Sequence, residues 1–175
     1  MTIAIEPLIT EQQIRDRVVA LAGEIAPQLQ PGTVVVALLK GAFVFAADLL
    51  RELARHHLEI NLDFMVLSSY GSDTRSSGRV LINLDCQKLV DNRDVLLLDD
   101  ILDSGNTLTF AANHMRFKGA VKITTCVLLD KPSRRQTPFQ ADFVGFTIPD
   151  LFVVGYGIDH AERFRELPYI GHLKE

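Results

Sequence analysis

One stretch of the chain, between Val95 and Leu108, constrains the fold more than any other. Four apolar residues, Val95 to Leu98, run directly into two adjacent carboxylates, Asp99 and Asp100. An uninterrupted apolar run is typical of a parallel strand that is buried on both faces. A short polar loop and a helical pattern follow, so the stretch predicts a strand, loop and helix of an α/β sheet. The two acids would then lie at the carboxyl end of the strand, where open α/β sheets bind ligands.

The loop after the acids, residues 103–107, has the composition of a phosphate site. It reads Asp-Ser-Gly-Asn-Thr, which supplies hydroxyl groups and closely spaced backbone N–H groups. Because it opens a helix, the helix N-terminus adds further N–H donors and a favourable dipole. The neighbouring carboxylates can accept hydrogen bonds from hydroxyl groups. Acids and loop together fit a phosphorylated sugar.

The remaining sequence repeats strands and helices in an order typical of α/β proteins. Thr10 and Gln13 form a capping-box pattern ahead of a helix with apolar residues at Ile14, Val18 and Leu21. Further helices are expected at 42–53 and 108–115, and strands at 33–39, 58–64, 80–84, 95–99, 122–129, 143–147 and 152–156. This order predicts an α/β fold with a twisted, mainly parallel sheet flanked by helices on both faces. The N-terminal helix and the C-terminal tail are expected to form a small cap on a single domain, residues 1–175.

Composition excludes some classes of partner. The 175 residues carry a net charge of −4 without a basic block, which argues against nucleic acid as the main partner. The apolar stretch 34–50 is interrupted by Lys40, Gly41 and Asp48 and falls short of the ~20 apolar residues of a membrane span. No signal peptide is visible at the start, and Cys86 and Cys126 are expected to be buried, reduced thiols. We therefore expect a cytoplasmic protein that binds neither membranes nor nucleic acid.

The stretch around the acids also resembles a known motif. An apolar run, two acids, two apolar residues and then Asp-Ser-Gly-Asn-Thr is similar to the phosphoribosyl-pyrophosphate motif of type I phosphoribosyltransferases. The segment 148–159, Ile-Pro-Asp-Leu-Phe-Val-Val-Gly-Tyr-Gly-Ile-Asp, resembles the hypoxanthine-guanine branch of that family, in its bacterial form. The resemblance extends from Leu39 to about Gly171.

This resemblance implies a reaction in purine salvage. A 6-oxopurine would react with 5-phospho-α-D-ribose 1-diphosphate to give a nucleoside 5′-monophosphate and pyrophosphate, with Mg²⁺ bridging the pyrophosphate. The resemblance does not decide whether the substrate is hypoxanthine alone or both hypoxanthine and guanine, and it leaves the use of xanthine open as well. The family also implies a homodimer or homotetramer.

The resemblance assigns residues to the sugar diphosphate. Asp99 and Asp100 would recognise the ribose hydroxyls and lie near metal-bound water, and Asp159 would be a metal ligand. Ser104, Gly105, Asn106 and Thr107 would hold the 5′-phosphate. Pyrophosphate would contact the turn Lys40-Gly41 and Arg165. Ser69 and Tyr70 would begin a mobile lid that excludes water from the reacting sugar.

Other residues would recognise and activate the base. Asp103 would lie near the purine N7 as a general acid or base. Lys131 would donate to the 6-oxo group and disfavour a 6-amino group. Phe152 would stack on the base, and the backbone of Val153 would meet its edge. Two positions depart from the commoner family pattern: Asp99 stands where Glu is more frequent, and Asn106 where Lys is frequent.

Each assignment has a simpler alternative. The two adjacent acids could form a solvated turn, Asp103 could cap the following helix, Lys40 could be an exposed turn residue, and Phe152 could be part of the core. The polar stretch 68–78 could be an unstructured hairpin, and Asp159 and Arg165 could be surface charges.

Two other functions also fit part of the sequence. A regulator that senses the sugar diphosphate and binds nucleic acid would need an added basic segment. A phosphoryl-transfer domain that uses the acids for Mg²⁺ would leave Lys131 and Phe152 unexplained. Nucleotide formation from the sugar diphosphate and a purine separates these possibilities.

Overall fold

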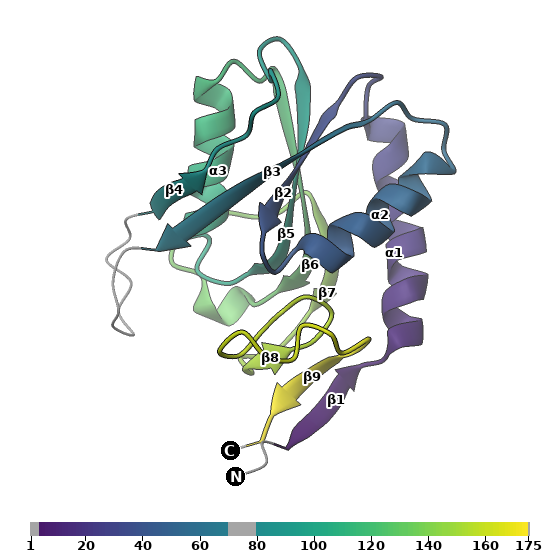
Figure 1. The fold of residues 1–175 in the computed structure, drawn as a ribbon, viewed down its shortest axis with the longest axis vertical. Helices are drawn as coiled ribbons and strands as arrows, with labels where there is room; N and C mark the ends of the chain where they lie inside the picture. Colours follow the sequence, from purple (N-terminus) through teal and green to yellow (C-terminus); the bar gives the residue numbers. More distant parts are fainter. Residues whose placement is uncertain (1–3, 70–79, 175) are drawn as a thin grey trace.

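The computed structural model describes residues 4–69 and 80–174 and contains a six-stranded twisted sheet (Figure 1). The strand order is β4-β3-β2-β5-β6-β7, and only β4 runs antiparallel to its neighbour. The strands are β2 (Val34–Leu39), β3 (Asn61–Ser69), β4 (Val80–Leu84), β5 (Asp94–Leu102), β6 (Lys122–Asp130) and β7 (Phe143–Thr147). The predicted mainly parallel α/β sheet is confirmed.

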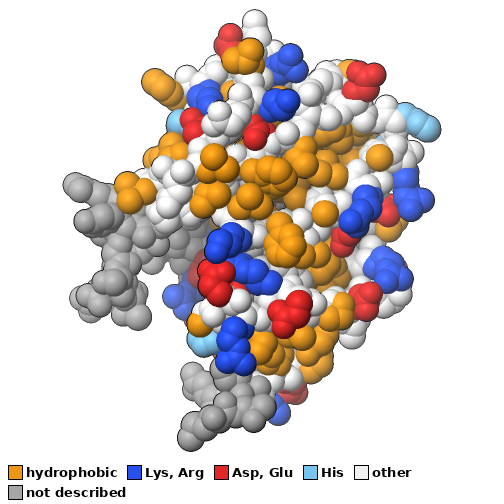
Figure 2. Space-filling model, viewed as in Figure 1, with side chains coloured by type: hydrophobic (Ala, Val, Ile, Leu, Met, Phe, Trp, Pro, Cys, Tyr) orange, Lys and Arg blue, Asp and Glu red, His pale blue; other side chains and the backbone are white. Residues whose placement is uncertain are grey.

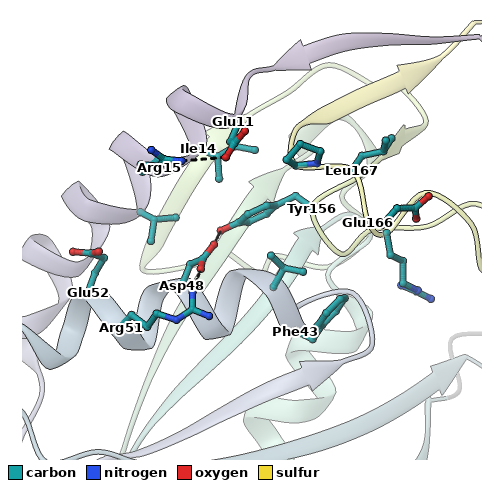
Figure 3. Close-up of a pocket in the computed structure, with 14 residues that line it drawn as sticks. Glu11, Ile14, Arg15, Phe43, Asp48, Arg51, Glu52, Tyr156, Glu166 and Leu167 are labelled. Carbon is teal, nitrogen blue, oxygen red and sulfur yellow. Dashed lines mark hydrogen bonds and ion pairs between the residues drawn. The ribbon is translucent and has the colours of Figure 1, made fainter.

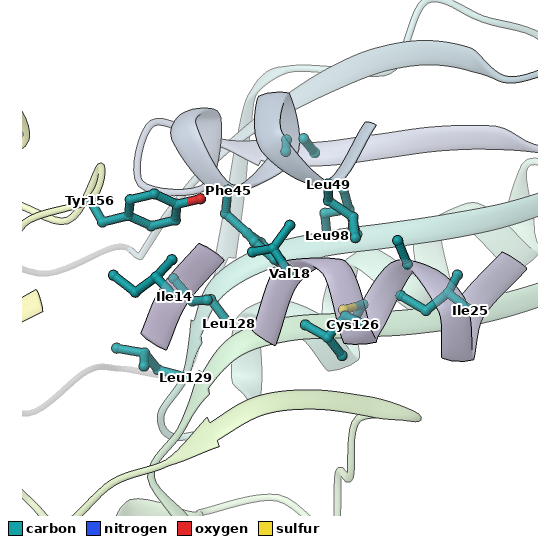
Figure 4. Packing of buried hydrophobic residues seen from close by; sticks show 14 of the residues in the cluster. Ile14, Val18, Ile25, Phe45, Leu49, Leu98, Cys126, Leu128, Leu129 and Tyr156 are labelled. Carbon is teal, nitrogen blue, oxygen red and sulfur yellow. The ribbon is translucent and has the colours of Figure 1, made fainter. Parts of the chain in front are cut away.

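Helices cover both faces of this sheet. On one face lie α1 (Glu11–Ile25) and α2 (Phe43–Ala54), and on the other lies α3 (Asn106–Phe117). Alternate residues of β2 supply the two cores: Val35 packs with the α1 and α2 side chains, and Val36 packs with those of α3. Figure 4 shows the first core, where α1 and α2 bury their apolar stripes against β5 and β6. Two short 3-10 helices, η1 (Ala26–Gln28) and η2 (Pro132–Arg134), follow α1 and β6.

The chain changes direction across the sheet between β2 and β5. From β2 it continues to β3, and from β5 it continues to β6 on the opposite side. Pairing of β2 with β5 ends at Ala37 and Leu98, whereas β5 stays paired with β6 as far as Leu102. A crevice therefore opens at the carboxyl end of β5, which is where ligands bind in sheets of this kind. Strand β5 also continues past Asp99, where the sequence pattern predicted its end, because β6 still supplies hydrogen-bond partners.

A small antiparallel sheet caps this end of the molecule (Figure 1). It has the order β1-β9-β8 and consists of β1 (Ile5–Ile9), β9 (Ile170–Leu173) and β8 (Val153–Val154). A cap built from both chain ends is thus confirmed, but the prediction that the N-terminal helix belongs to it is wrong. The buried residues of α1, Ile14, Val18, Leu21, Ala22 and Ile25, pack in the main core instead.

Local signals placed most elements but not all their ends. The capping box at the start of α1 is present, with Gln13 N donating to Thr10 Oγ1 at 3.3 Å and Thr10 N donating to Gln13 Oε1 at 2.8 Å. Strand β3 begins three residues later than predicted, since its register is fixed by pairing of Asn61 with Val34. Within residues 4–69 and 80–174, no helix is both long and apolar enough to cross a membrane.

Candidate active site

A cleft of about 250 Å³ opens where β2 and β5 separate. Its walls are the last residues of β2, one residue of β3, and β5 with the loop that follows it. Seven residues that the sequence analysis singled out line this cleft together: Gly41, Asp99, Asp100, Asp103, Ser104, Gly105 and Thr107. These seven residues therefore lie together, whereas Asn106, also assigned to the phosphate, does not line the cleft.

Of the two adjacent acids, Asp99 is buried and Asp100 is half-buried. Asp99 is only 7% exposed, and its Oδ1 accepts a hydrogen bond of 3.0 Å from the backbone N–H of Asp100. Removal from water raises the pKa of the Asp99 carboxyl, and the charge of Asp100 raises it further. Burial also raises the pKa of Asp100. The alternative of a solvated acidic turn is wrong, and both groups would be stabilised by hydroxyl donors or a cation in the cleft.

The loop after β5 is held from behind and leaves the start of α3 open. Gly105 precedes α3 with φ of 87°, and a Cβ there would come within 2.3 Å of Thr137 Oγ1, so both backbone and space require glycine. The Ser104 carbonyl accepts from the backbone N–H groups of Gln136 at 2.9 Å and Thr137 at 3.2 Å. The first-turn N–H groups of α3 have no intrahelical acceptors. The Asn106 N–H donates to Ser104 Oγ at 3.3 Å, and the remaining first-turn N–H groups are donors of the kind that the predicted anion site requires.

The turn after β2 is wedged between the acids and the C-terminal segment. The Leu39–Lys40 peptide bond is cis. A Cβ on Gly41 would lie 1.8 Å from Asp100 Oδ2, and a Cβ on Gly157 would lie 2.3 Å from the Gly41 carbonyl oxygen. Both glycines are thus required for close approach, and the turn borders the cleft directly.

A group of four charges lies beside this turn. Lys40 Nζ is 3.1 Å from Glu162 Oε2, and Arg165 Nη2 is 2.9 Å from Asp159 Oδ1 and 3.4 Å from Glu162 Oε2. The cations Lys40 and Arg165 lower the pKa of Glu162, which is exposed. The structure thus brings together the two cations that were assigned to pyrophosphate, although neither lines the cleft itself. Glu162 was not anticipated, since nothing in its local sequence distinguishes it from a surface acid.

The residues assigned to the base follow β6 or lie at the start of β8, and Lys131 is bonded to a residue that lines the cleft. Lys131 is 7% exposed, and its backbone N–H donates to the Leu102 carbonyl at 2.9 Å. Phe152 is 56% exposed, so the alternative of core packing is wrong; its ring meets that of His160 edge-on, with centroids 5.1 Å apart. Val153 is buried in β8. An exposed aromatic ring and a buried lysine are the kinds of group that bind a flat, polar heterocycle.

Asp103 is fixed by two arginines that the sequence analysis did not single out. Arg134 Nε lies 3.1 Å from Asp103 Oδ1, and Arg135 Nη1 donates to the Asp103 carbonyl at 2.8 Å. Arg134 Nη1 also lies 3.3 Å from Asp150 Oδ1. The sequence did contain a signal for these arginines: Arg134 and Arg135 are adjacent and follow β6, whose carboxyl end lies at the same edge of the sheet as Asp99 and Asp100. Asp103 itself lies in the cleft wall and precedes the N-cap position, which Gly105 occupies, so the capping alternative is wrong.

Two residues assigned to a lid cannot be compared with the structure. Ser69 is the last residue of β3, and its side chain, like the whole of Tyr70, lies outside the described residues.

The cleft could hold Mg²⁺ only together with a bound substrate that supplies further oxygen ligands. Within the described part of the chain, no three His, Cys, Asp or Glu side chains form a cluster that could hold a metal ion. Mg²⁺ keeps several waters and is usually bound by one or two carboxylates together with substrate phosphates. The carboxylates of Asp99 and Asp100, which both line the cleft, meet that requirement. Asp159, the other expected ligand, is ion-paired with Arg165 instead.

A larger hollow of about 610 Å³ lies away from the acids, between α1, α2 and the segment 156–168 (Figure 3). At its centre the Tyr156 hydroxyl donates to Asp48 Oδ2 at 2.6 Å. Burial and this bond raise the pKa of Tyr156, so the hydroxyl stays protonated. Arg165 lines this hollow. Its lining carries charges of both signs but none of the acids of the cleft.

Comparisons with known proteins agree with this geometry. The family model for a phosphoribosyl transferase domain matches residues 9–161. The hypoxanthine-guanine phosphoribosyltransferase of Bacillus subtilis is 46% identical over 168 residues, which cover 95% of this chain and 92% of that protein. The hypoxanthine phosphoribosyltransferase of Escherichia coli is 42% identical over 172 residues, 97% of this chain and 95% of that protein. A crystal structure of a Bacillus anthracis hypoxanthine-guanine phosphoribosyltransferase superposes with a TM-score of 0.92 at 41% identity, covering 99% of this chain and 100% of that one.

Proposed function

This chain belongs to the phosphoribosyl transferase family, and from that membership we propose which residues carry out its reaction. It has hypoxanthine(-guanine) phosphoribosyltransferase activity in purine salvage. Its substrates are 5-phospho-α-D-ribose 1-diphosphate and a purine base. One observation supports the residue assignment: the cleft between β2 and β5 combines two adjacent acids with the N-terminus of α3.

The sugar diphosphate would lie along this cleft. Ser104, Gly105, Asn106 and Thr107 bind the 5′-phosphate through hydroxyl and backbone N–H groups at the start of α3. Asp99 and Asp100 accept hydrogen bonds from the ribose hydroxyls.

The pyrophosphate would occupy the side of the cleft bordered by Lys40 and Gly41. Lys40 and Arg165, now paired with Glu162 and Asp159, supply the positive charge. Arginine suits phosphate because its planar fork donates two parallel hydrogen bonds. Mg²⁺, bound through the diphosphate with Asp99, Asp100 and Asp159 as candidate ligands, would neutralise the leaving group.

The purine would rest against Phe152, with Lys131 donating to its 6-oxo group and the Val153 backbone at its edge. As the bond from ribose C1 to pyrophosphate breaks, positive charge develops on the sugar and the base nitrogen attacks. Asp103 accepts the proton that the base loses and returns it in the reverse reaction. A base with a 6-amino group presents a donor to Lys131 and is disfavoured.

The test measures nucleotide formation from the sugar diphosphate, Mg²⁺ and four competing bases: hypoxanthine, guanine, xanthine and adenine. Hypoxanthine should be consumed and adenine should react poorly; this competition also decides between hypoxanthine alone and hypoxanthine with guanine. For the residue assignment, Asp103→Asn should lower turnover much more than affinity for the sugar diphosphate. Equal losses in both would contradict the proposed role of Asp103.

We also propose that the chain forms a homodimer or homotetramer in the cytoplasm. Figure 2 shows hydrophobic side chains gathered on one face, over β3 and the neighbouring part of α2. The exposed large hydrophobic residues of these elements and of β4 are Phe43, Leu62, Leu81, Ile82 and Leu84. An apolar face of this kind favours contact with a second copy of the chain, and two free, buried cysteines suit a reducing compartment. Light scattering on the purified protein measures the oligomeric state, and a monomer at all concentrations would contradict the proposal of a homodimer or homotetramer.

A further inference from the structure

We propose that Arg134 is a positioning residue that holds the Asp103 carboxylate in the orientation needed to exchange a proton with the base. The inference rests on the proposed role of Asp103. It begins from the place of Arg134 in η2, between two acids from different segments. Its Nε lies 3.1 Å from Asp103 Oδ1, and its Nη1 lies 3.3 Å from Asp150 Oδ1. The guanidinium therefore joins the loop after β5 to the loop that leads to Phe152.

The contact with Asp103 attracts the carboxylate without using up its acceptor. Asp103 Oδ1 is buried and, among the described residues, accepts no hydrogen bond, so its contact with Arg134 is an ion pair. Because Oδ1 is covered, a purine cannot reach it, and the oxygen left open to the base is Oδ2, on a side chain that is 40% exposed. The protonated ring nitrogen of a purine would donate its hydrogen bond to Oδ2. The positive charge beside Oδ1 thus fixes where Oδ2 lies.

The backbone beneath the carboxylate is already held in place. Arg135 Nη1 donates to the Asp103 carbonyl at 2.8 Å, and the next carbonyl, that of Ser104, accepts two backbone N–H groups. The remaining freedom of Asp103 is rotation of its own side chain. Arg134 is the cation that restricts this rotation, and its second ion pair with Asp150 restrains the guanidinium in turn.

Arg134 adds little to folding by this contact. Its side chain is 53% exposed, and exposed ion pairs contribute only slightly to stability. A misplaced catalytic group, in contrast, slows a reaction strongly even when the displacement is small. The consequence of losing Arg134 should therefore appear in the rate of the chemical step.

The experiment compares Arg134→Gln, Arg134→Lys, Asp103→Asn and the double variant Arg134→Gln/Asp103→Asn with the wild-type enzyme. Single-turnover formation of nucleotide reports the chemical step, and steady-state KM values report binding of each substrate. Arg15→Gln is the matched control, since Arg15 forms an exposed ion pair with Glu11 at 3.0 Å on α1, far from the cleft. Melting temperatures verify that every variant is folded.

We expect Arg134→Gln to slow the single-turnover rate about tenfold with the KM for the sugar diphosphate within about twofold of wild type. Arg134→Lys should recover part of the rate, and Arg15→Gln should match wild type. In the Asp103→Asn background, removal of Arg134 should cause no further loss, since two residues that act through one group are not additive. An unchanged rate in Arg134→Gln, no recovery in Arg134→Lys, or multiplied losses in the double variant would overturn the inference. A wild-type enzyme that forms no nucleotide would instead refute the proposed function.

Discussion

The contact between Gly41 and Asp100 makes Gly41→Ala the sharpest test of the cleft. A Cβ at this position would lie 1.8 Å from Asp100 Oδ2 and 2.5 Å from its Cγ, whereas ordinary contacts begin at 3.4 Å. The carboxylate or the turn must therefore move by about 1.6 Å, the difference between the first and last of these distances. Asp100 lies within β5, and its Oδ1 accepts a hydrogen bond from the Ile101 N–H at 2.9 Å.

Rotation of the Asp100 carboxylate is the easier way to relieve the clash. It breaks that hydrogen bond, which contributes about 0.5–1.5 kcal/mol. For a chain of this size, a loss of about 1 kcal/mol lowers the Tm by roughly 2–4 °C. Rotation also removes a proposed ribose acceptor from its place, and a misplacement of about 1 Å costs on the order of 100-fold in rate. We therefore expect kcat/KM for the sugar diphosphate to fall about 100-fold while the protein stays folded.

Gly23→Ala is the matched control for this variant. Gly23 lies within α1, and a Cβ there meets nothing within 4 Å. The same substitution should raise stability by about 0.5–1 kcal/mol and leave activity unchanged. Steady-state kinetics, calorimetric titration with the sugar diphosphate and thermal melting measure all three quantities. Wild-type kcat/KM and affinity in Gly41→Ala would refute the reasoning, because they would show that the turn and the acid do not need to meet.

Three further predictions concern the base site and the thiols. Phe152→Ala should raise the KM for hypoxanthine about tenfold, the scale of one lost stacking contact. The Tm should not change because the ring is 56% exposed. A clearly lower Tm would show that Phe152 packs in the core and would contradict this prediction. Lys131→Met should lower kcat/KM for hypoxanthine roughly 10- to 100-fold, the scale of a lost charged hydrogen bond. In competition between the two bases, kcat/KM for adenine should fall less than kcat/KM for hypoxanthine. Equal decreases for both bases would show that Lys131 does not select the base. Burial raises the pKa of Cys86 from 9.0 to about 11, so the contribution of its protonated thiol to stability is present below pH 9.0 and is lost as the pH rises towards 11. Between these pH values the Tm of the wild type should therefore fall more steeply than that of Cys86→Ala. Equal slopes for the two proteins would contradict this prediction.

Features that depend on local pattern were predictable from the sequence. The apolar run of β5, the capping box of α1 and the glycine before α3 each state a backbone requirement within a few residues. They were enough to place the acids and the phosphate loop at one edge of a parallel sheet. The prediction for the end of β5 was wrong by three residues, since the end depends on β6, whose pairing no local pattern records.

Features that depend on the approach of distant segments could not be predicted. The periodicity of α1 shows that one face is apolar but does not say which surface covers it, so the helix was assigned to the cap and not to the main core. Glu162 reaches Lys40 only because the C-terminal segment folds back over the turn after β2. A pair of acids or cations in a sequence carries no information on which opposite charge it will meet.

The glycines show how these two kinds of information combine at the site. A glycine with positive φ, such as Gly105, is recognisable from its place between a strand and a helix. Gly41 and Gly157 instead stand where other groups come too close for a side chain: the Asp100 carboxylate in one case and the Gly41 carbonyl in the other. Asp100, Gly41 and Gly157 come from three separate segments, and Gly41 lies close to both of the other two. The site therefore depends on the absence of side chains at these glycines as well as on its charged groups, and a side chain at Gly41 or Gly157 should impair binding by displacing the groups that surround it.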